Sequence, residues 1–180
     1  MYVQANAPGR GVMETPGRPR GNPAVLPTQG SVMSRIIYVL NGPNLNLLGT
    51  REPHLYGSTT LAQVEAMCRR LCGELGLALE FRQTNHEGVL VDWVQEARER
   101  AAAIVINPAG LSFRSIPLLD ALKTVDQPIA EVHVTNIHRR DALYQHSLVS
   151  LAATGVICGF GPFGYELAIR ALAQRLAAAD

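Results

Sequence analysis

RIIYVLNGPN, from Arg35 to Asn44, joins a run of five apolar residues to a polar segment that contains glycine and proline. Short, almost wholly apolar runs are typical of strands that are buried on both faces of a parallel sheet. Four later runs have the same character. Together they predict strands at Ile36–Leu40, Ala78–Arg82, Ala103–Ile106, Ile129–His133 and Gly155–Cys158.

Amphipathic segments separate these runs and predict helices at Thr60–Leu75, Val89–Ala101, Ile116–Val125 and Tyr165–Ala178. The first of them begins with a capping box, in which Thr60 is followed three residues later by Gln63. Strands that alternate with helices indicate a parallel sheet with crossover helices. We therefore expect an α/β fold, a flavodoxin-like doubly wound five-stranded parallel sheet in a single domain over residues 35–180.

The chain has 180 residues, of which 47% are apolar and 17% charged, values that fit one globular domain. Residues 1–34 differ, because they hold five of the eleven prolines and five of the sixteen glycines without an apolar run. Such a composition buries too little surface to offset its ordering entropy. We expect a disordered N-terminal extension, with Met33 as a second candidate start of translation.

The net charge is +1, from sixteen basic and fifteen acidic residues, which argues against nucleic acid or an anionic membrane as partner. Small neutral or anionic ligands fit better. Cys68, Cys72 and Cys158 are too few and wrongly spaced for a disulfide framework or a zinc site. Without a membrane helix or the apolar core of a signal peptide, we expect a reduced, cytoplasmic protein.

The segments that follow the predicted strands are rich in polar side chains that do not titrate, namely Asn41, Asn44, Thr84, Asn85, Asn107, Thr135 and Asn136. In doubly wound sheets, ligands bind beyond the carboxyl ends of the strands. We therefore expect a polar pocket there, formed without metal. The GFGPFG segment at 159–164 matches a dinucleotide-binding motif, but it follows the last strand and leaves no room for the second strand that such a site needs.

Four separated segments have a further property in common: LNGPNLNLLGTREPHLYG at 40–57, NHEG at 85–88, INPAG at 106–110 and EVHVTNIHRR at 131–140. In order and spacing they closely resemble the type II 3-dehydroquinase family, over about residues 35–175. The resemblance implies that 3-dehydroquinate, a small anionic hydroxylated cyclic compound, is dehydrated to 3-dehydroshikimate through an enolate, in the shikimate or quinate pathway. It also implies that no metal or cofactor takes part.

Removal of a proton α to a carbonyl needs a base, and Tyr56 matches the catalytic tyrosine of the family. A free tyrosine with a pKa near 10 is ionised about one part in a thousand at pH 7, a cost of roughly 4 kcal/mol. Arg51 matches the arginine that lowers this cost, because a nearby cation can lower such a pKa by about 1 to 3 units. His133 matches the general acid that protonates the departing hydroxyl, with Glu131 placed to orient it.

The resemblance assigns further roles around these groups. Asn44 matches the residue that holds an enolate-stabilising water, and Asn107 together with the backbone of Val134 and Thr135 matches the contacts to the substrate carboxylate. Asp120 matches an acidic residue that reaches the site of a neighbouring subunit. The family assembles as a homo-oligomer, a dodecamer of trimers.

Two positions depart from the family pattern. Phe113 stands where N-P-G-A-Y-T-H-T-S has a substrate-binding histidine, and Tyr144 stands where A-R-E-x-F-R has an arginine that would hold ring hydroxyls. Each lost contact is worth about 0.5 to 3 kcal/mol, so the loss of two would weaken turnover. Three interpretations stay open: a weak dehydroquinase, a paralogue for a related hydroxylated cyclic ketone, and a binding protein that has lost catalysis.

Overall fold

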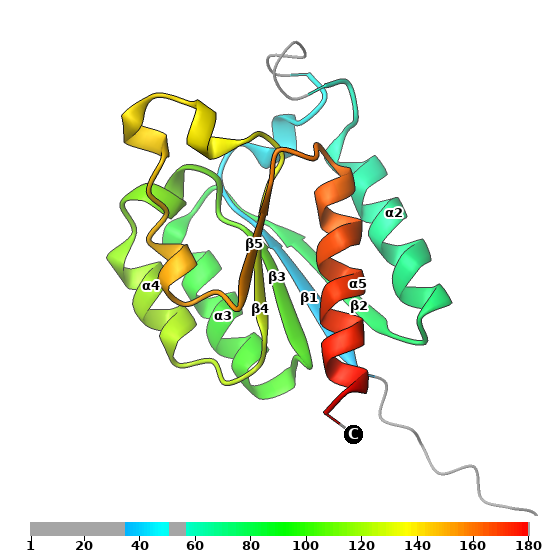
Figure 1. The fold of residues 1–180 in the computed structure, drawn as a ribbon. Coiled ribbons are helices and arrows are strands. Elements are labelled where there is room, and N and C mark those ends of the chain that lie inside the picture. The colour runs from blue at the N-terminus through cyan, green and yellow to red at the C-terminus, as the bar shows by residue number, and fades with distance from the viewer. Residues whose placement is uncertain (1–34, 51–56, 180) are drawn as a thin grey trace, which may run out of the picture. The chain divides into compact units, whose positions relative to one another are not determined.

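A computed structural model describes residues 35–50 and 57–179 and contains one five-stranded parallel sheet in the order β2-β1-β3-β4-β5 (Figure 1). The strands are β1 (Ile36–Asn41), β2 (Ala78–Gln83), β3 (Ala103–Asn107), β4 (Ile129–His133) and β5 (Gly155–Cys158). This order is the flavodoxin-like order of a doubly wound sheet. The predicted fold class is confirmed, and the N-terminal extension expected for residues 1–34 lies outside the described residues.

Four helices of the described residues cover the sheet: α2 (Leu61–Glu74), α3 (Glu87–Arg100), α4 (Ile116–Lys123) and α5 (Phe163–Ala177). In Figure 1, α2 and α5 lie on one face of the sheet, and α3 and α4 lie on the other. Short 3-10 helices lie in the connections that the structure describes: η1 (Leu45–Leu47), η2 (Ala109–Phe113), η3 (Ile137–Arg139), η4 (Ala142–Tyr144) and η5 (Val149–Leu151). None of the helices in the described part of the chain is long and apolar enough to cross a membrane.

Alternate residues of each strand point to opposite faces and form two separate cores. In β1, Ile37 and Val39 pack with α2 and α5, whereas Tyr38 and Leu40 pack with α3 and α4. The buried thiols of Cys68 and Cys72 belong to the first core. The same alternation decides on which face the polar residues at the strand ends lie.

The predicted elements are confirmed, with small shifts at their ends. Three strands continue one residue further, to Asn41, Gln83 and Asn107, because these polar residues still pair in the sheet. Helix α3 begins two residues before the predicted Val89, at Glu87, where the negative side chain suits the helix N-terminus. The capping box is present: Thr60 Oγ1 accepts from the backbone N–H of Gln63, whose side chain accepts from the Thr60 N–H.

The strand order reverses between β1 and β3, and the segments that follow these two strands touch directly. The Gly42 N–H donates to the Asn107 carbonyl oxygen over 2.8 Å, and a Cβ at Gly42 would stand only 2.4 Å from the Pro108 carbonyl oxygen. Only glycine permits this approach of the two backbones. Beyond this contact, the segments that follow β1 and β3 run apart. The space between them is the place where doubly wound folds bind their ligands.

Candidate active site

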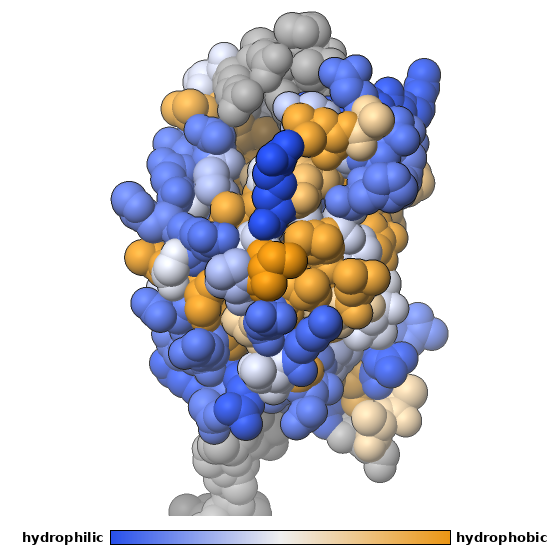
Figure 2. Space-filling model, turned by 90° about the vertical axis from the view of Figure 1, so that its left-hand side faces the viewer, coloured by the Kyte–Doolittle hydropathy of each residue, from blue (hydrophilic) through white to orange (hydrophobic). Residues whose placement is uncertain are grey.

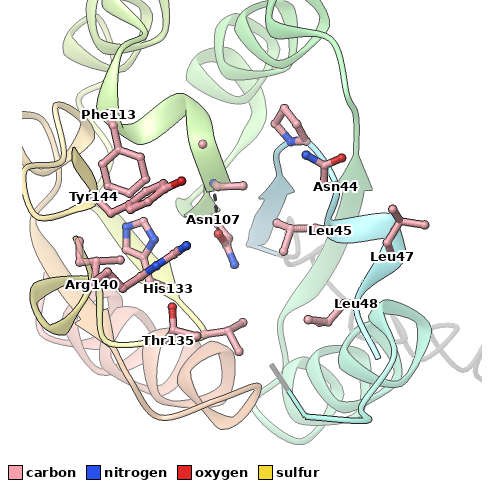
Figure 3. Close-up of a pocket in the computed structure, with 15 residues that line it drawn as sticks. Asn44, Leu45, Leu47, Leu48, Asn107, Phe113, His133, Thr135, Arg140 and Tyr144 are labelled. Atoms are coloured by element: carbon pink, nitrogen blue, oxygen red, sulfur yellow. Dashed lines mark hydrogen bonds between the residues drawn. The ribbon is translucent and has the colours of Figure 1, made fainter. Parts of the chain in front are cut away.

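A pocket of about 280 Å³ opens at this reversal point, close to the lower end of the range for small-molecule sites, about 300–1,000 Å³. The segments after β1, β3 and β4 form its walls, together with η3 and η4. Figure 3 shows the Asn44–Leu48 segment on one side and Phe113, Tyr144, His133 and Arg140 on the other, with Asn107 between them. The lining residues are Pro43, Asn44, Leu45, Leu47, Leu48, Asn107, Ala109, Gly110, Phe113, His133, Val134, Thr135, Ile137, Arg140 and Tyr144.

Most of the predicted site residues meet in this pocket: Asn44, Asn107, Phe113, His133, Val134, Thr135 and Tyr144 all line it. Asp120 does not, because it lies exposed on α4. Arg51 and Tyr56, the predicted cation and base, lie outside the described residues.

His133 ends β4 and is held from behind by Glu131, two residues earlier on the same face of the strand. Its Nε2 atom lies 2.7 Å from Glu131 Oε1, which also accepts from the Ser147 hydroxyl, while Oε2 accepts from the Ser150 hydroxyl. Burial raises the pKa of Glu131, but the hydrogen bonds from His133, Ser147 and Ser150 outweigh burial and hold this pKa below its usual value. Glu131 is therefore a carboxylate that accepts from Nε2–H, which leaves Nδ1 of His133 for the pocket.

Asn107 approaches the pocket from the opposite face of the sheet. It ends β3 two residues after Val105, on the side of α2 and α5, and is buried. Its Nδ2 donates to the Tyr165 hydroxyl over 2.8 Å, and its Oδ1 accepts from the backbone N–H of Ala109. The sheet thus brings a histidine from one face and an amide from the other to a common edge.

Asn44 adopts a left-handed backbone conformation, with φ 67°, which asparagine tolerates better than most residues. The turn is held by the NHEG segment, because the Asn44 N–H donates to Asn85 Oδ1 over 2.8 Å. Gln83 Nε2 donates to the same oxygen and to the Gly42 carbonyl. The side chain of Asn44 makes no hydrogen bond within the described residues and lines the pocket.

The two departures from the family pattern form one aromatic cluster with their neighbours. The Phe113 ring stacks on His133 with centroids 6.2 Å apart, and it meets the Tyr144 ring edge-on at 5.4 Å. The Arg140 guanidinium lies 4.1 Å above the Tyr144 ring. Arg140 therefore brings a positive charge to a pocket wall that is otherwise aromatic.

Sequence reasoning missed four residues around this site: Arg140, Ser147, Ser150 and Tyr165. Arg140 lies in the Arg139-Arg140 pair, where the sequence gives no sign of which arginine faces the pocket. The serines and Tyr165 contact residues that are 16 to 124 positions away along the chain. Only the assembled sheet reveals these partners.

Residues 35–173 match the family model described as Dehydroquinase class II. The chain is 56% identical over 140 residues to 3-dehydroquinate dehydratase 1 of Agrobacterium fabrum, an alignment that covers 78% of this chain and 97% of that protein. It is 53% identical over 147 residues to 3-dehydroquinate dehydratase 2 of Pseudomonas aeruginosa, covering 82% and 99%.

The fold is also similar to solved structures. The type II dehydroquinase of Propionibacterium acnes superposes with a TM-score of 0.76 at 45% sequence identity, over 79% of this chain and 98% of that one. A second type II dehydroquinase, from Butyrivibrio crossotus, gives a TM-score of 0.76 at 36% identity, over 77% and 97%. The pocket and the match over nearly the whole folded region agree, and this chain belongs to the class II dehydroquinase family.

Proposed function

We propose that this protein dehydrates 3-dehydroquinate to 3-dehydroshikimate, acting as a carbon–oxygen lyase. One observation carries the proposal: His133, backed by the buried carboxylate of Glu131, faces a pocket that also holds the amides of Asn44 and Asn107. An elimination next to a carbonyl needs a proton donor for the leaving hydroxyl and neutral donors for the developing oxyanion. These residues supply both kinds of group.

His133 is the general acid in this proposal. The Glu131 carboxylate accepts from Nε2–H of the doubly protonated imidazole, so that Nδ1–H can deliver its proton to the departing hydroxyl, which leaves as water. The hydroxyls of Ser147 and Ser150 hold the carboxylate in turn. Such a chain keeps the imidazole orientation constant during turnover, which avoids reorganisation in the transition state.

Tyr56 is the base and Arg51 its cationic partner, by the family motif. Arg51 stabilises the tyrosinate that abstracts the proton α to the carbonyl. The resulting enolate is stabilised by a water that Asn44 holds. Asn107 and the backbone of Val134 and Thr135 bind the substrate carboxylate.

The two departures change substrate binding and leave the elimination groups in place. Phe113 and Tyr144 line the pocket where the family motif has histidine and arginine. Curated relatives at 52–57% identity are named 3-dehydroquinate dehydratase, which favours this reaction over a related cyclic ketone or a binding protein without activity. We therefore propose an active dehydratase that binds its substrate with fewer polar contacts.

The experiment is direct, because the conjugated product absorbs ultraviolet light and the substrate does not. Purified protein mixed with 3-dehydroquinate should produce this absorbance, and Tyr56→Phe should abolish it while the circular dichroism spectrum stays the same. Arg51→Ala should be almost as severe and should move the pH optimum upward. Near-full activity of Tyr56→Phe would show that the proposed base is wrong.

We also propose a homo-oligomer in which Asp120 reaches the site of a neighbouring subunit, as in the trimers of the family dodecamer. Figure 2 shows apolar side chains gathered on the side of the molecule that carries α4. Large exposed apolar residues on the elements of that side are Ile116, Leu143 and Leu151. An exposed carboxylate beside uncovered apolar surface suits a subunit contact better than open solvent.

Complementation between two inactive variants tests this arrangement. Asp120→Asn and Tyr56→Phe are mixed, dissociated in mild denaturant and allowed to reassemble. Activity above the sum of the two is expected, because an Asp120→Asn subunit with intact Tyr56 then receives Asp120 from its neighbour. No recovery, in mixed oligomers shown by light scattering to have formed, would place Asp120 outside the site.

The three free cysteines suit the reducing cytoplasm as the place of action.

A further inference from the structure

The fully buried Tyr165 hydroxyl joins two residues at the ends of neighbouring strands. It donates to Asn41 Oδ1, at the end of β1, over 2.7 Å, and accepts from Asn107 Nδ2, at the end of β3, over 2.8 Å. Asn41 Nδ2 donates in turn to the Arg82 carbonyl oxygen over 3.0 Å. A chain of hydrogen bonds therefore runs from the pocket residue Asn107 through α5 to the backbone of β2.

The direction of donation along this chain is determined by the Arg82 carbonyl oxygen at its end. A carbonyl oxygen only accepts, so Asn41 must turn its Nδ2 to Arg82 and its Oδ1 to Tyr165. Tyr165 must then donate to Asn41, which leaves its oxygen to accept from Asn107. Independently, the Ala109 N–H donates to Asn107 Oδ1 and requires the same orientation of that amide.

One N–H of Asn107 is thus committed to Tyr165, and the other has no acceptor within the described part of the chain. Asn107 lines the pocket, so this second N–H is available to an oxygen of the substrate. Burial raises the pKa of Tyr165, so its hydroxyl stays protonated and keeps its place in the chain of donors at any working pH.

We propose that Tyr165 is a positioning residue for substrate binding, whose hydroxyl holds the Asn107 amide with an N–H directed to the substrate carboxylate. This inference rests on the proposed dehydratase function. Without the hydroxyl, Asn107 Nδ2 can turn to Asn41 Oδ1 or rotate by half a turn. Either change weakens the donor that the substrate needs, and the second presents a carbonyl oxygen to an anion.

The test compares Tyr165→Phe with Tyr38→Phe. Both tyrosines are buried and both donate a hydrogen bond, but Tyr38 donates to Glu96 over 2.9 Å on the opposite face of the sheet, outside the pocket lining. In Tyr165→Phe we expect KM to rise about tenfold, near the lower end of the worth of one hydrogen bond to a charged group because the amide is misdirected rather than removed, with kcat within about threefold and the pH profile unchanged. Tyr38→Phe should lose similar stability without a change in KM.

A second experiment uses Asn107→Ala to test whether Tyr165 acts through Asn107. If Tyr165 acts through Asn107, adding Tyr165→Phe to Asn107→Ala should leave KM unchanged. If Tyr165→Phe fails to fold, Asn41→Ala removes the acceptor that directs the same hydroxyl and should raise KM alike. A KM unchanged in the folded variant, or a full additional loss on top of Asn107→Ala, would overturn the proposal.

The two proposals fail differently. A wild-type protein that turns over 3-dehydroquinate while Tyr165→Phe keeps its KM would overturn the positioning role alone. A wild-type protein without turnover would refute the proposed function. In that case the dissociation constant for 3-dehydroquinate, measured by calorimetry in the same variants, replaces KM. Equal dissociation constants for the wild-type protein and Tyr165→Phe, or no binding at all, would overturn the positioning role as well.

Discussion

Restoring the polar residues of the family motif in the double variant Phe113→His, Tyr144→Arg should raise kcat/KM for 3-dehydroquinate by well over tenfold. Both side chains line the pocket, and their rings touch each other, with centroids 5.4 Å apart. The variant therefore exchanges one aromatic contact for two donors at the substrate. It also removes the ring on which the Arg140 guanidinium rests.

The gain in kcat/KM and the loss of stability have different sizes. Each donor returned to the substrate is worth about 1 to 3 kcal/mol if the contact persists in the transition state, and about 1.4 kcal/mol already gives a factor of ten. Loss of the aromatic pair costs about 0.5 to 1.5 kcal/mol of stability. Loss of the cation–π contact costs about 0.5 to 2 kcal/mol more. We therefore expect faster turnover together with a Tm lower by about 2 to 14 °C, since about 1 kcal/mol shifts Tm by 2 to 4 °C in a protein of this size.

The assay follows product absorbance for the wild-type protein, each single variant and the double variant. Because the two residues are in contact, their effects should not add, and the cycle of variants measures this coupling. The matched control is Phe113→Leu, Tyr144→Leu, which removes both rings but supplies no donor, and which should lower Tm without raising kcat/KM. A gain in this control as large as in the polar variant would attribute the effect to pocket volume. A polar variant with wild-type kcat/KM and a lowered Tm would refute the reasoning.

Three further predictions concern stability and mechanism. Ala109 has φ 50°, a left-handed conformation that costs a residue with a Cβ about 1 to 2 kcal/mol, so Ala109→Gly should raise the free energy of urea unfolding by up to about 1 kcal/mol. Glu96 accepts hydrogen bonds from Arg82 and, with a smaller effect, from Tyr38, and these bonds lower its pKa to about 2. The contribution of Glu96 to stability should therefore be present above about pH 4.5 and be lost as the pH falls toward 2. Glu96→Gln should remove this part of the acid dependence of unfolding. Lys123, the one lysine of the chain, lies exposed at the end of α4, so borohydride should trap no substrate on the protein; a stable adduct in the mass spectrum would require an imine mechanism.

Local sequence patterns predicted most of the fold because the signals are local. The run Ile36–Leu40 is apolar on both faces, and its burial on both faces follows from that composition alone. The pair Thr60 and Gln63 closes a hydrogen-bonded ring within four residues, so the start of α2 needs no tertiary contact. The polar ends of the strands do not follow from local patterns, since Asn41 joins the sheet only through pairing with β2 and β3.

Site residues that lie at the end of a strand can be predicted from the sequence. Residues that support them from a distant part of the chain cannot. His133 and Asn107 follow apolar runs, so their place at the edge of the sheet follows from the strands. Tyr165 lies 58 residues from Asn107 and 124 from Asn41, inside a segment whose sequence predicts nothing beyond a helix. Its role depends on α5 packing against the face to which both asparagines point.

Three polar lining residues, His133, Asn107 and Asn44, share one feature: each is fixed by a polar partner from another position in the sequence. Glu131 holds His133, Tyr165 holds Asn107, and Asn85 holds the backbone of Asn44. Groups fixed in this way need not reorganise as charge develops, which is the condition for electrostatic catalysis. Phe113 and Tyr144 have no such support, because they rest on each other and on their neighbours through ring contacts. Substitutions at the supporting partners should therefore damage activity more than substitutions at the two aromatic positions, although the supporting side chains are further from the substrate.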